Sequence, residues 1–430
     1  MKRAALFLAA AAAIFAPAAS AQDFAITNAK VAIGDGGAPI EGGTVLVRAG
    51  KVVAAGAGVA VPAGVTVVDG SGKWVTPGLF SAVTDLGLWD VGAVDASNDT
   101  SADGSPFSAA LDVSVAINPA SQHIAISREG GGTRASVTPL NGKSIFAGQG
   151  AVIDLGADPN AVLVPRAFQL VQLGEGGAQL AGGSRVSAYL TLRSALAEAR
   201  DIAATPAARR TDAMLTRADA QALVAVVEGR QALYVAVDRA ADIRQVLSLK
   251  GDFPNLKLVI VGATEGWMVA REIAAAGVPV VTVPLTDLPA SFEALASTQS
   301  NVGRMKAAGV KVALGAFLGG NQPRYAPQQA GNLVALNKLP GATGLSWGDA
   351  LAAITSVPAD ISGMAGKAGV LKPGAVGDVV LWDGDPLEVS SAPVTVWIDG
   401  VQQPLGNHQS RLKKRYRDLD ESTLPKAYDW

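Results

Sequence analysis

The fold is decided by the stretch Val75-Thr76-Pro77-Gly78-Leu79-Phe80-Ser81-Ala82-Val83-Thr84-Asp85-Leu86-Gly87. It follows a run of short β-like segments, and its Pro-Gly pair is a strong local break. The strand-like run after the break carries polar groups toward a terminal glycine. We interpret this run as the first strand of an (α/β) barrel, whose C-terminal end would present side chains to a pocket.

The composition is that of a large globular protein. The chain has 430 residues, of which 49% are apolar and 17% are charged, and its mean hydropathy is +0.29. This is enough for one large core and a smaller second domain. The sequence pI is about 5.8, and no basic stripe is present in the body of the chain. Nucleic-acid binding is therefore not expected.

The first 21 residues have the pattern of an export signal. Lys2 and Arg3 precede an apolar run, and Ala19-Ser20-Ala21 forms a small-residue cleavage site. The apolar run is too short to span a membrane, so we predict cleavage after Ala21, a periplasmic location and no membrane attachment. Loss of these two cations leaves 33 Lys and Arg against 37 Asp and Glu, a net charge of −4. The absence of cysteine excludes disulfides and thiolate chemistry.

The two ends of the chain show matching strand patterns. Residues 24–75 contain short alternating runs between glycine turns, including a predicted hairpin with Gly50 at its turn. Residues 371–382 and 394–400 contain similar runs. Between the two ends, apolar strand-like runs alternate with helical ones, which is typical of a parallel barrel. The clearest are a helix at 186–204 and strands at 233–237, 256–262, 277–284 and 309–315.

The quoted stretch resembles the first barrel strand of the amidohydrolase superfamily, most closely its imidazolonepropionase-like and prolidase-like members. In that family it reads Pro-Gly-hydrophobic-hydrophobic-Asp-x-His-x-His-hydrophobic-Gly, and both histidines bind the catalytic metal. The resemblance extends from Ile26 to Gly400. It is also carried by Thr264-Glu265-Gly266, Lys311-Val312-Ala313-Leu314-Gly315 and Gly384-Asp385-Pro386-Leu387.

The resemblance implies an α/β fold of two parts. A TIM-like (β/α)8 barrel would occupy residues 77–365. A small β-sandwich would be built from residues 22–76 and 366–405, and residues 406–430 would form a charged tail. The activity that it implies is metal-dependent hydrolysis of C–N bonds in amides, ureas, cyclic imides or dipeptides, with zinc or another divalent ion. A fold alone does not establish that activity.

The positions that the family uses for chemistry carry other residues here. The two histidines of the first strand correspond to Val83 and Asp85, and the histidine of a later strand corresponds to Asp238. On the last strand, Phe317 stands where the family has its general-base aspartate. A bridging carbamylated lysine is also excluded from the middle of the barrel, because no lysine occurs between Lys143 and Lys250. We therefore expect no zinc cofactor.

No other residues supply the missing ligands or a different nucleophile. The two histidines are His123, in an early helix or loop, and His408, in the tail, and both are expected to be surface or packing residues. The sequence has no Gly-x-Ser-x-Gly elbow and no cysteine. Asp85, Asp238 and Glu265 leave two alternatives. They could converge and hold Ca²⁺ or Mg²⁺, or lie apart, each pairing with an arginine such as Arg239 or capping a helix.

Two hypotheses for the function follow. The first is a catalytically silent member of the family that binds a small molecule or assembles with a catalytically competent relative. The alternative is an active hydrolase on C–N bonds that uses an unusual site of Asp85, Asp238 and Glu265. The sequence determines neither the substrate or ligand, nor the partner chain, nor whether the chain forms an oligomer.

Overall fold

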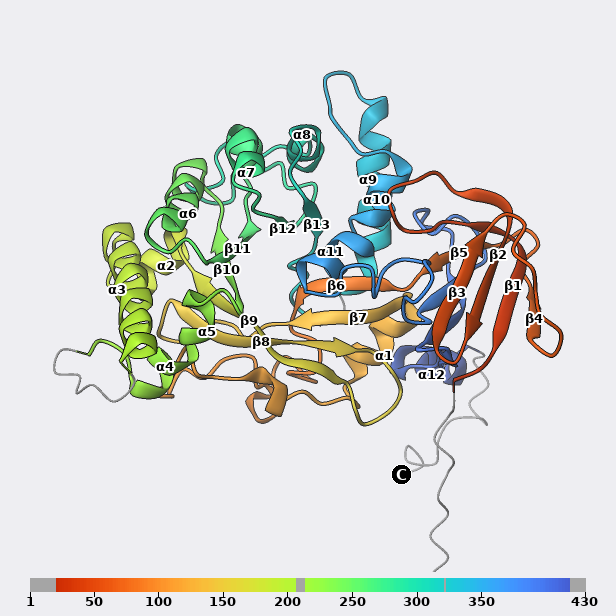
Figure 1. Cartoon of the computed structure of the whole chain (residues 1–430), viewed down its shortest axis with the longest axis horizontal. Coiled ribbons are helices and arrows are strands. Elements are labelled where there is room, and N and C mark those ends of the chain that lie inside the picture. The colour runs from red at the N-terminus through yellow and green to blue at the C-terminus, as the bar shows by residue number, and fades with distance from the viewer. Residues whose placement is uncertain (1–20, 206–212, 321, 418–430) are drawn as a thin grey trace, which may run out of the picture.

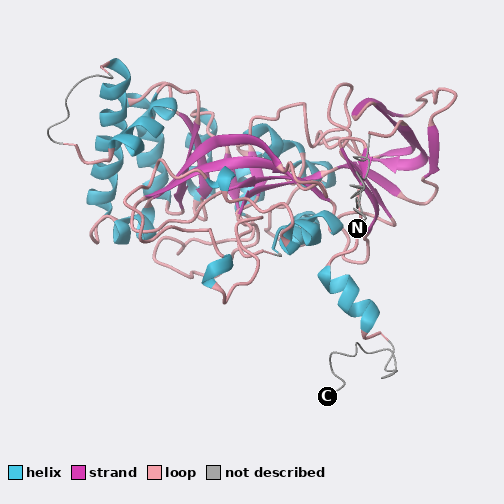
Figure 2. Ribbon diagram, turned by 90° about the horizontal axis from the view of Figure 1, so that it is seen from below, coloured by secondary structure: helices cyan, strands magenta, loops and turns pink. Residues whose placement is uncertain are grey.

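The protein consists of a barrel and a separate sheet made from both ends of the chain (Figures 1 and 2). The structure is a computed structural model that describes residues 21–205, 213–320 and 322–417. Except for Ala21, the predicted export signal lies outside the described residues, as does the tail beyond residue 417. No helix in the described ranges has the length and apolarity needed to cross a membrane.

The terminal sheet has eight strands, in the order β16-β15-β14-β5-β1-β2-β3, with β4 paired to β1. Its middle pairing joins β5 antiparallel to β14, which brings the two ends of the chain together as predicted. Ala49 and Gly50 adopt φ values of 47° and 74°, a turn geometry that suits the twist of a two-residue hairpin between β2 and β3. The strands are β1 Phe24–Val31, β2 Ile40–Arg48, β3 Lys51–Gly56, β4 Thr66–Asp69, β5 Trp74–Pro77, β14 Val379–Trp382, β15 Pro393–Ile398 and β16 Val401–Gln402.

The barrel also has eight strands, in the order β13-β12-β11-β10-β9-β8-β7-β6. A parallel bridge between Ala82 and Gly315 joins its first and last strands and nearly closes it. The predicted barrel is therefore confirmed. Its strands are β6 Leu79–Thr84, β7 Gly132–Val137, β8 Phe146–Asp154, β9 Val162–Gln172, β10 Ala232–Val237, β11 Lys257–Gly262, β12 Val280–Thr282 and β13 Val312–Leu314.

One strand departs from the (β/α)8 pattern. Strand β8 runs antiparallel to both β7 and β9, whereas the other barrel pairings are parallel. The connections on either side of β8 span residues 138–145 and 155–161. A parallel crossover needs about a dozen residues or more, so these connections permit only antiparallel neighbours.

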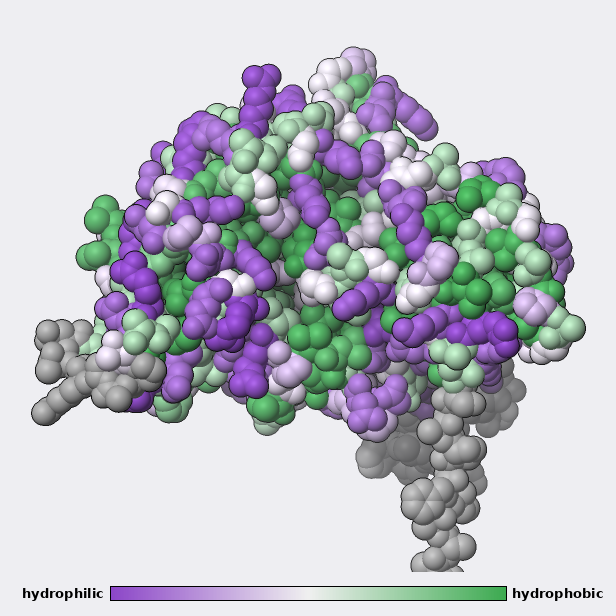
Figure 3. Space-filling model, in the orientation of Figure 1, coloured by the Kyte–Doolittle hydropathy of each residue, from purple (hydrophilic) through white to green (hydrophobic). Residues whose placement is uncertain are grey.

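Helices cover the outside of the barrel, and Figure 1 shows α3, α6, α7 and α8 in an arc around β10–β13. In Figure 3, hydrophobic residues gather in the hollow inside this arc and hydrophilic residues cover the helices. Along β10, Leu233, Val235 and Val237 belong to the outer core, while Tyr234 belongs to the apolar interior of the barrel. The helices are α1 Gln122–Glu129, α2 Gly174–Leu180, α3 Arg185–Ala204, α4 Arg217–Ala222, α5 Val224–Val227, α6 Ala240–Asp252, α7 Ala270–Ala275, α8 Asn301–Ala307, α9 Ala326–Ala335, α10 Trp347–Ala352, α11 Ser356–Ile361 and α12 His408–Arg415, with 3-10 helices at Asp95–Ser97, Val113–Val115, Gly266–Val269, Gln322–Tyr325 and Leu336–Lys338.

Gly78 marks the point where the chain leaves the terminal sheet and enters the barrel. It lies between β5 and β6, against the buried Thr133 of β7. A Cβ atom at Gly78 would come within 2.0 Å of the Thr133 Oγ1 atom. The Pro-Gly break in the decisive stretch therefore has a packing reason as well as a conformational one.

A buried ion pair joins the two parts of the molecule. The guanidinium of Arg134, on β7, donates from Nε to Asp378 at 2.8 Å and from Nη2 to Asp399 at 2.7 Å. Arg134 is 2% exposed and Asp378 is 1% exposed. Burial alone would lower the pKa of Arg134, but the two carboxylates more than offset it, and the pKa lies above its ordinary value.

Asp154, at the end of β8 near this ion pair, gives a prediction about pH. Burial raises the pKa of Asp154 from 3.8 to about 6, against the opposing effects of the Gly156 amide and Arg134. The folded protein therefore holds a proton that the unfolded chain releases, and this stabilisation is lost as the pH rises from 3.8 to 6. At pH 7 the free energy of unfolding of Asp154→Asn should exceed that of wild type by up to about 3 kcal/mol, so the variant is more stable. At pH 3.5 the two free energies should be close to each other.

The measurement is denaturant unfolding of both proteins at several values between pH 3.5 and 7. The difference between them isolates Asp154 from the other carboxylates, which titrate in both proteins. A difference that does not change with pH would contradict the assignment.

Candidate functional site

The parallel strands of the barrel end at one rim, which we call the mouth. It is formed by the C-terminal ends of β6, β10, β11, β12 and β13. Side chains that follow these strand ends are the ones that barrel enzymes use for chemistry. Asp85 follows β6, Asp238 follows β10 and Glu265 follows β11.

Asp85 is bound to the loop after β13. Its Oδ2 accepts a hydrogen bond from the Gly319 amide at 2.8 Å, and its Oδ1 accepts one from the Gly320 amide at 3.2 Å. The carboxylate is 4% exposed. Both carboxylate oxygens of Asp85, which follows β6, are thus hydrogen-bonded to the backbone that follows β13.

Asp238 and Glu265 are also engaged with neighbouring chain segments. Oδ1 of Asp238 accepts from the Thr264 amide at 3.0 Å and from the Thr264 hydroxyl at 2.6 Å. Oε2 of Glu265 accepts from the amide of Ala240, the first residue of α6, at 3.0 Å. Its Oε1 accepts from the Ala296 amide at 3.2 Å. Glu265 therefore supplies a cap to a helix that has no capping side chain of its own.

The structure does not bring the three carboxylates together as a metal site. Among the described residues, no group of three or more His, Cys, Asp or Glu side chains is arranged to hold a metal ion. The contacts of Glu265 match the alternative in which it caps a helix. Within the described residues, no ion pair joins Asp85, Asp238 or Glu265 to Arg239, which is exposed.

An ionic network near the mouth was not predicted from the sequence. Arg185, at the start of α3, donates to Asp242 at 3.0 Å and to Glu293 at 3.2 Å. Glu293 is 8% exposed and also accepts from the Glu175 amide at 2.6 Å. Burial raises the pKa of Glu293, and the nearby charges of Asp238 and Glu175 add to this effect. Asp242 lies four residues after Asp238, but its partner Arg185 is far away in the sequence.

The inner wall of the barrel is apolar. Val83, Val261 and Val281 share one buried cluster, with Ala236 and Ala316 packed against it. Phe317 is 4% exposed and belongs to the outer core that packs against the helices. These side chains have no atoms that bind a metal or transfer a proton.

The backbone at the mouth is strained although the wall is apolar. Val83, Ala263 and Ala316, near the ends of β6, β11 and β13, have φ values of 56°, 52° and 57°. Such left-handed conformations are rare for residues with a Cβ atom, above all for a β-branched one, and occur mostly at functional sites. The mouth therefore combines a strained backbone with an apolar wall and with carboxylates that are hydrogen-bonded to neighbouring segments.

This strain predicts that Ala316→Gly stabilises the protein. Glycine removes a left-handed penalty of about 1–2 kcal/mol and adds about 0.5–1 kcal/mol of backbone entropy, so a net gain of about 0.5–1 kcal/mol is expected. Ala313→Gly is the matched control, because Ala313 lies inside β13 and does not have a positive φ. Urea unfolding should show a gain for Ala316→Gly and a loss for Ala313→Gly; a loss for both would contradict the strain.

His123 is a buried residue. It lies on α1 and is 7% exposed, and its ring centroid is 4.3 Å from that of Trp89. Its Nε2 lies 3.2 Å from the Asp90 carbonyl oxygen. The ring is thus buried rather than at the surface, and it lies beside Gly320, whose amide donates to Asp85. A packing role for this histidine stays a prediction.

Comparison with known proteins places this geometry in a family. The model of the Amidohydrolase family matches residues 268–403. A solved amidohydrolase from Thermotoga maritima MSB8 is 24% identical and superposes with a TM-score of 0.77, covering 88% of this chain and 99% of its own. Residues 268–403 thus match the Amidohydrolase family, and the chain as a whole has the fold of the solved amidohydrolase. A prolidase solved with N-methylphosphonate-L-proline is 17% identical and has a TM-score of 0.53, covering 89% of this chain and 99% of its own.

One curated amidohydrolase matches only a short segment. Amidohydrolase tasK of Hapsidospora irregularis is 52% identical over 60 residues, which are 14% of this chain and 6% of that protein. The chain thus matches a small part of that relative's length. The match supports the amidohydrolase superfamily and carries no information on the substrate.

The residues at the mouth do not fit the metal that amidohydrolases use. Zinc sites in enzymes take imidazole and carboxylate ligands that converge on one ion. Here Val83 is apolar, while Asp85 and Asp238 are occupied by hydrogen bonds to neighbouring loops and to Thr264. Phe317 cannot accept a proton from water. Among the described residues, the mouth therefore has no converging set of ligands for a hydrolytic metal.

Proposed function

We propose that this amidohydrolase-fold protein is catalytically silent and acts as a binding or assembly protein. One observation carries the proposal: the mouth keeps a strained, family-like backbone, yet its carboxylates hold loops in place and its wall is apolar. Water is a poor nucleophile unless a metal or a base activates it. In the described part of the chain, no group of three metal-binding side chains converges at the mouth, which supports the proposal.

The proposal is tested by assaying the purified protein on a dipeptide, a cyclic imide and a phenylurea, with and without added Zn²⁺ or Mn²⁺. A catalytically competent amidohydrolase serves as the positive control. The expected rate equals that of the buffer for every substrate. Turnover that depends on the protein and disappears in Asp85→Asn would overturn the proposal and favour an active carboxylate site.

An assembly role predicts a complex in the native extract. Native mass measurement of the protein captured from its own cells should show either a copy of this chain or a larger partner. We further propose that the protein acts in the periplasm after cleavage behind Ala21. The sequence pattern of residues 1–21 supports this location. Fractionation and N-terminal sequencing should find a mature chain that begins at Gln22.

A further inference from the structure

A cavity opens at the end of the barrel opposite the mouth. Its volume is about 520 Å³. The cavity is lined by Phe168 of β9, Ala232 at the start of β10, Lys257 at the start of β11 and Lys311 just before β13. Because these parallel strands all begin here, the cavity lies at their N-terminal ends, and we call it the basal cavity.

The rim of the basal cavity is positively charged. Four cations line it, Arg230, Lys250, Lys257 and Lys311, against the single carboxylate of Asp360. Lys311 pairs with Asp360, and Arg230 pairs with Glu228. Lys250 donates only to the Ala276 carbonyl oxygen, at 3.0 Å. In the described part of the chain neither Lys250 nor Lys257 forms an ion pair with a carboxylate, so two positive charges are left over.

The floor of the cavity is apolar and aromatic. Phe168 and Tyr234 are both buried and stack with ring centroids 4.2 Å apart. Above these rings, the accessible apolar surface of the cavity is formed by the partly exposed Ala232, Pro279 and Ile361. The Tyr234 hydroxyl donates to the Ile361 carbonyl oxygen at 3.2 Å, so its polar end is satisfied without a ligand. An apolar floor below a few charged groups is the usual form of a small-molecule site.

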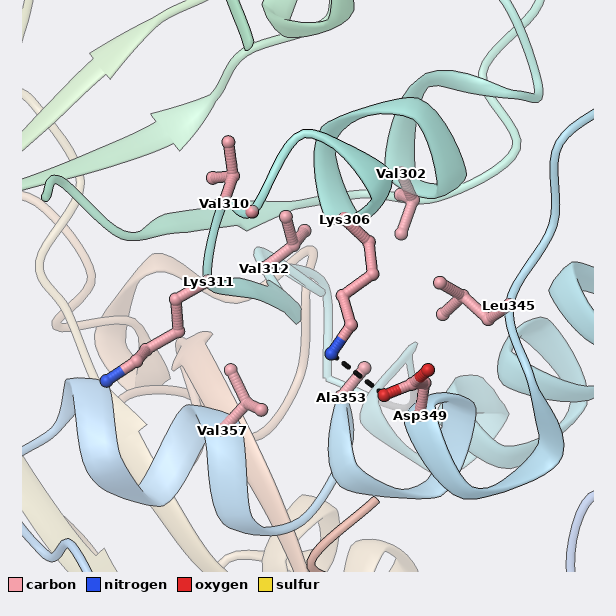
Figure 4. A pocket seen from close by; sticks show the side chains of 10 residues that line it. Val302, Lys306, Val310, Lys311, Val312, Leu345, Asp349, Ala353 and Val357 are labelled. Carbon is pink, nitrogen blue, oxygen red and sulfur yellow. Dashed lines mark ion pairs between the residues drawn. The ribbon is translucent and has the colours of Figure 1, made fainter. Parts of the chain in front are cut away.

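A neighbouring cavity differs from the basal cavity in its charges. It has a volume of about 300 Å³ and lies between α8, β13 and α10. Figure 4 shows its Lys306 reaching Asp349, an ion pair of 2.8 Å, while Lys311 extends away from that pair. Both lysines that line the smaller cavity are therefore paired, Lys306 with Asp349 and Lys311 with Asp360. The lysines without a carboxylate partner, Lys250 and Lys257, line the basal cavity.

We propose that the basal cavity binds an organic anion with an apolar body, such as a medium-chain carboxylate. The carboxylate would meet Lys250 and Lys257 at the rim. The hydrocarbon would lie on the partly exposed apolar side chains of Ala232, Pro279 and Ile361, which are backed by the buried rings of Phe168 and Tyr234. Charge-assisted hydrogen bonds fix the head group, and burial of apolar surface holds the body. This site is separate from the mouth and does not depend on whether the mouth is silent.

The test is calorimetric titration of the full-length protein with decanoate, decan-1-ol and inorganic phosphate. Decanoate should bind with a stoichiometry of one, at least about tenfold more tightly than decan-1-ol or phosphate. Lys257→Glu should weaken decanoate by about tenfold or more. Lys338→Glu is the matched control, since Lys338 is exposed and does not line the cavity, and it should bind like wild type.

Several outcomes would overturn the proposal. These are no binding of decanoate, equal affinity for decanoate and decan-1-ol, equal affinity for decanoate and phosphate, or equal losses in Lys257→Glu and Lys338→Glu. Ala232→Leu narrows the cavity without changing any charge and should also weaken decanoate. Circular dichroism shows whether each variant is folded. A variant that is folded but binds decanoate weakly has lost binding affinity and not its structure.

Discussion

Arg134→Ala is expected to lower the free energy of unfolding by about 3–5 kcal/mol. Arg134 is the buried link between the barrel and the terminal sheet, through Asp378 and Asp399. Removing it leaves the Asp378 carboxylate buried without its main counter-charge, which costs more than the pair itself contributes. Denaturant unfolding followed by circular dichroism measures the change.

Arg244→Ala is the control for this prediction. Arg244 also donates from both Nε and Nη2 to one carboxylate, that of Glu272, but both side chains are about half exposed. Exposed pairs contribute about 0.2–1 kcal/mol, so a small loss is expected. Losses of similar size in Arg134→Ala and Arg244→Ala would show that the buried pair is not a structural link.

Asp85→Ala is expected to destabilise the protein by about 2–4 kcal/mol. The substitution removes two hydrogen bonds to a carboxylate and leaves the buried Gly320 amide without an acceptor. Urea unfolding provides the measurement. Asp95→Ala is the control, because Asp95 is exposed in the 3-10 helix Asp95–Ser97 and should change stability by less than about 0.5 kcal/mol.

The same variant separates the two functional hypotheses. A carboxylate that only holds the loop after β13 predicts lost stability with no change in hydrolysis. A carboxylate that acts in catalysis predicts lost activity with little change in stability. An Asp85→Ala protein as stable as wild type would contradict the structural role described for Asp85.

Much of the fold follows from local sequence. Pro77 and Gly78 break the chain where it passes from one sheet to the other, and runs of β-branched residues mark β10 and β11. The antiparallel strand β8 was not predicted, although the short connections at 138–145 and 155–161 contain the necessary information. A parallel neighbour could not be reached across them.

The site was less predictable than the fold. The sequence placed Asp85, Asp238 and Glu265 after strands, but the partners of these carboxylates are backbone amides and a hydroxyl group from other segments. Arg185 and Glu293 form an ion pair although they lie 108 positions apart in the sequence. The left-handed backbone at Val83 could not be predicted from the sequence either, because a β-branched residue normally avoids that conformation.

The most direct test of catalytic silence is the metal content of the purified protein after equilibrium dialysis against Zn²⁺, Mn²⁺, Ca²⁺ and Mg²⁺. Elemental analysis of the dialysed protein should find no stoichiometric ion, since the mouth offers no converging ligands among the described residues. About one equivalent of zinc or manganese, lost in Asp85→Asn, would contradict the account and place a catalytic metal at the mouth. About one equivalent of calcium or magnesium with the same dependence would contradict it in favour of the carboxylate site.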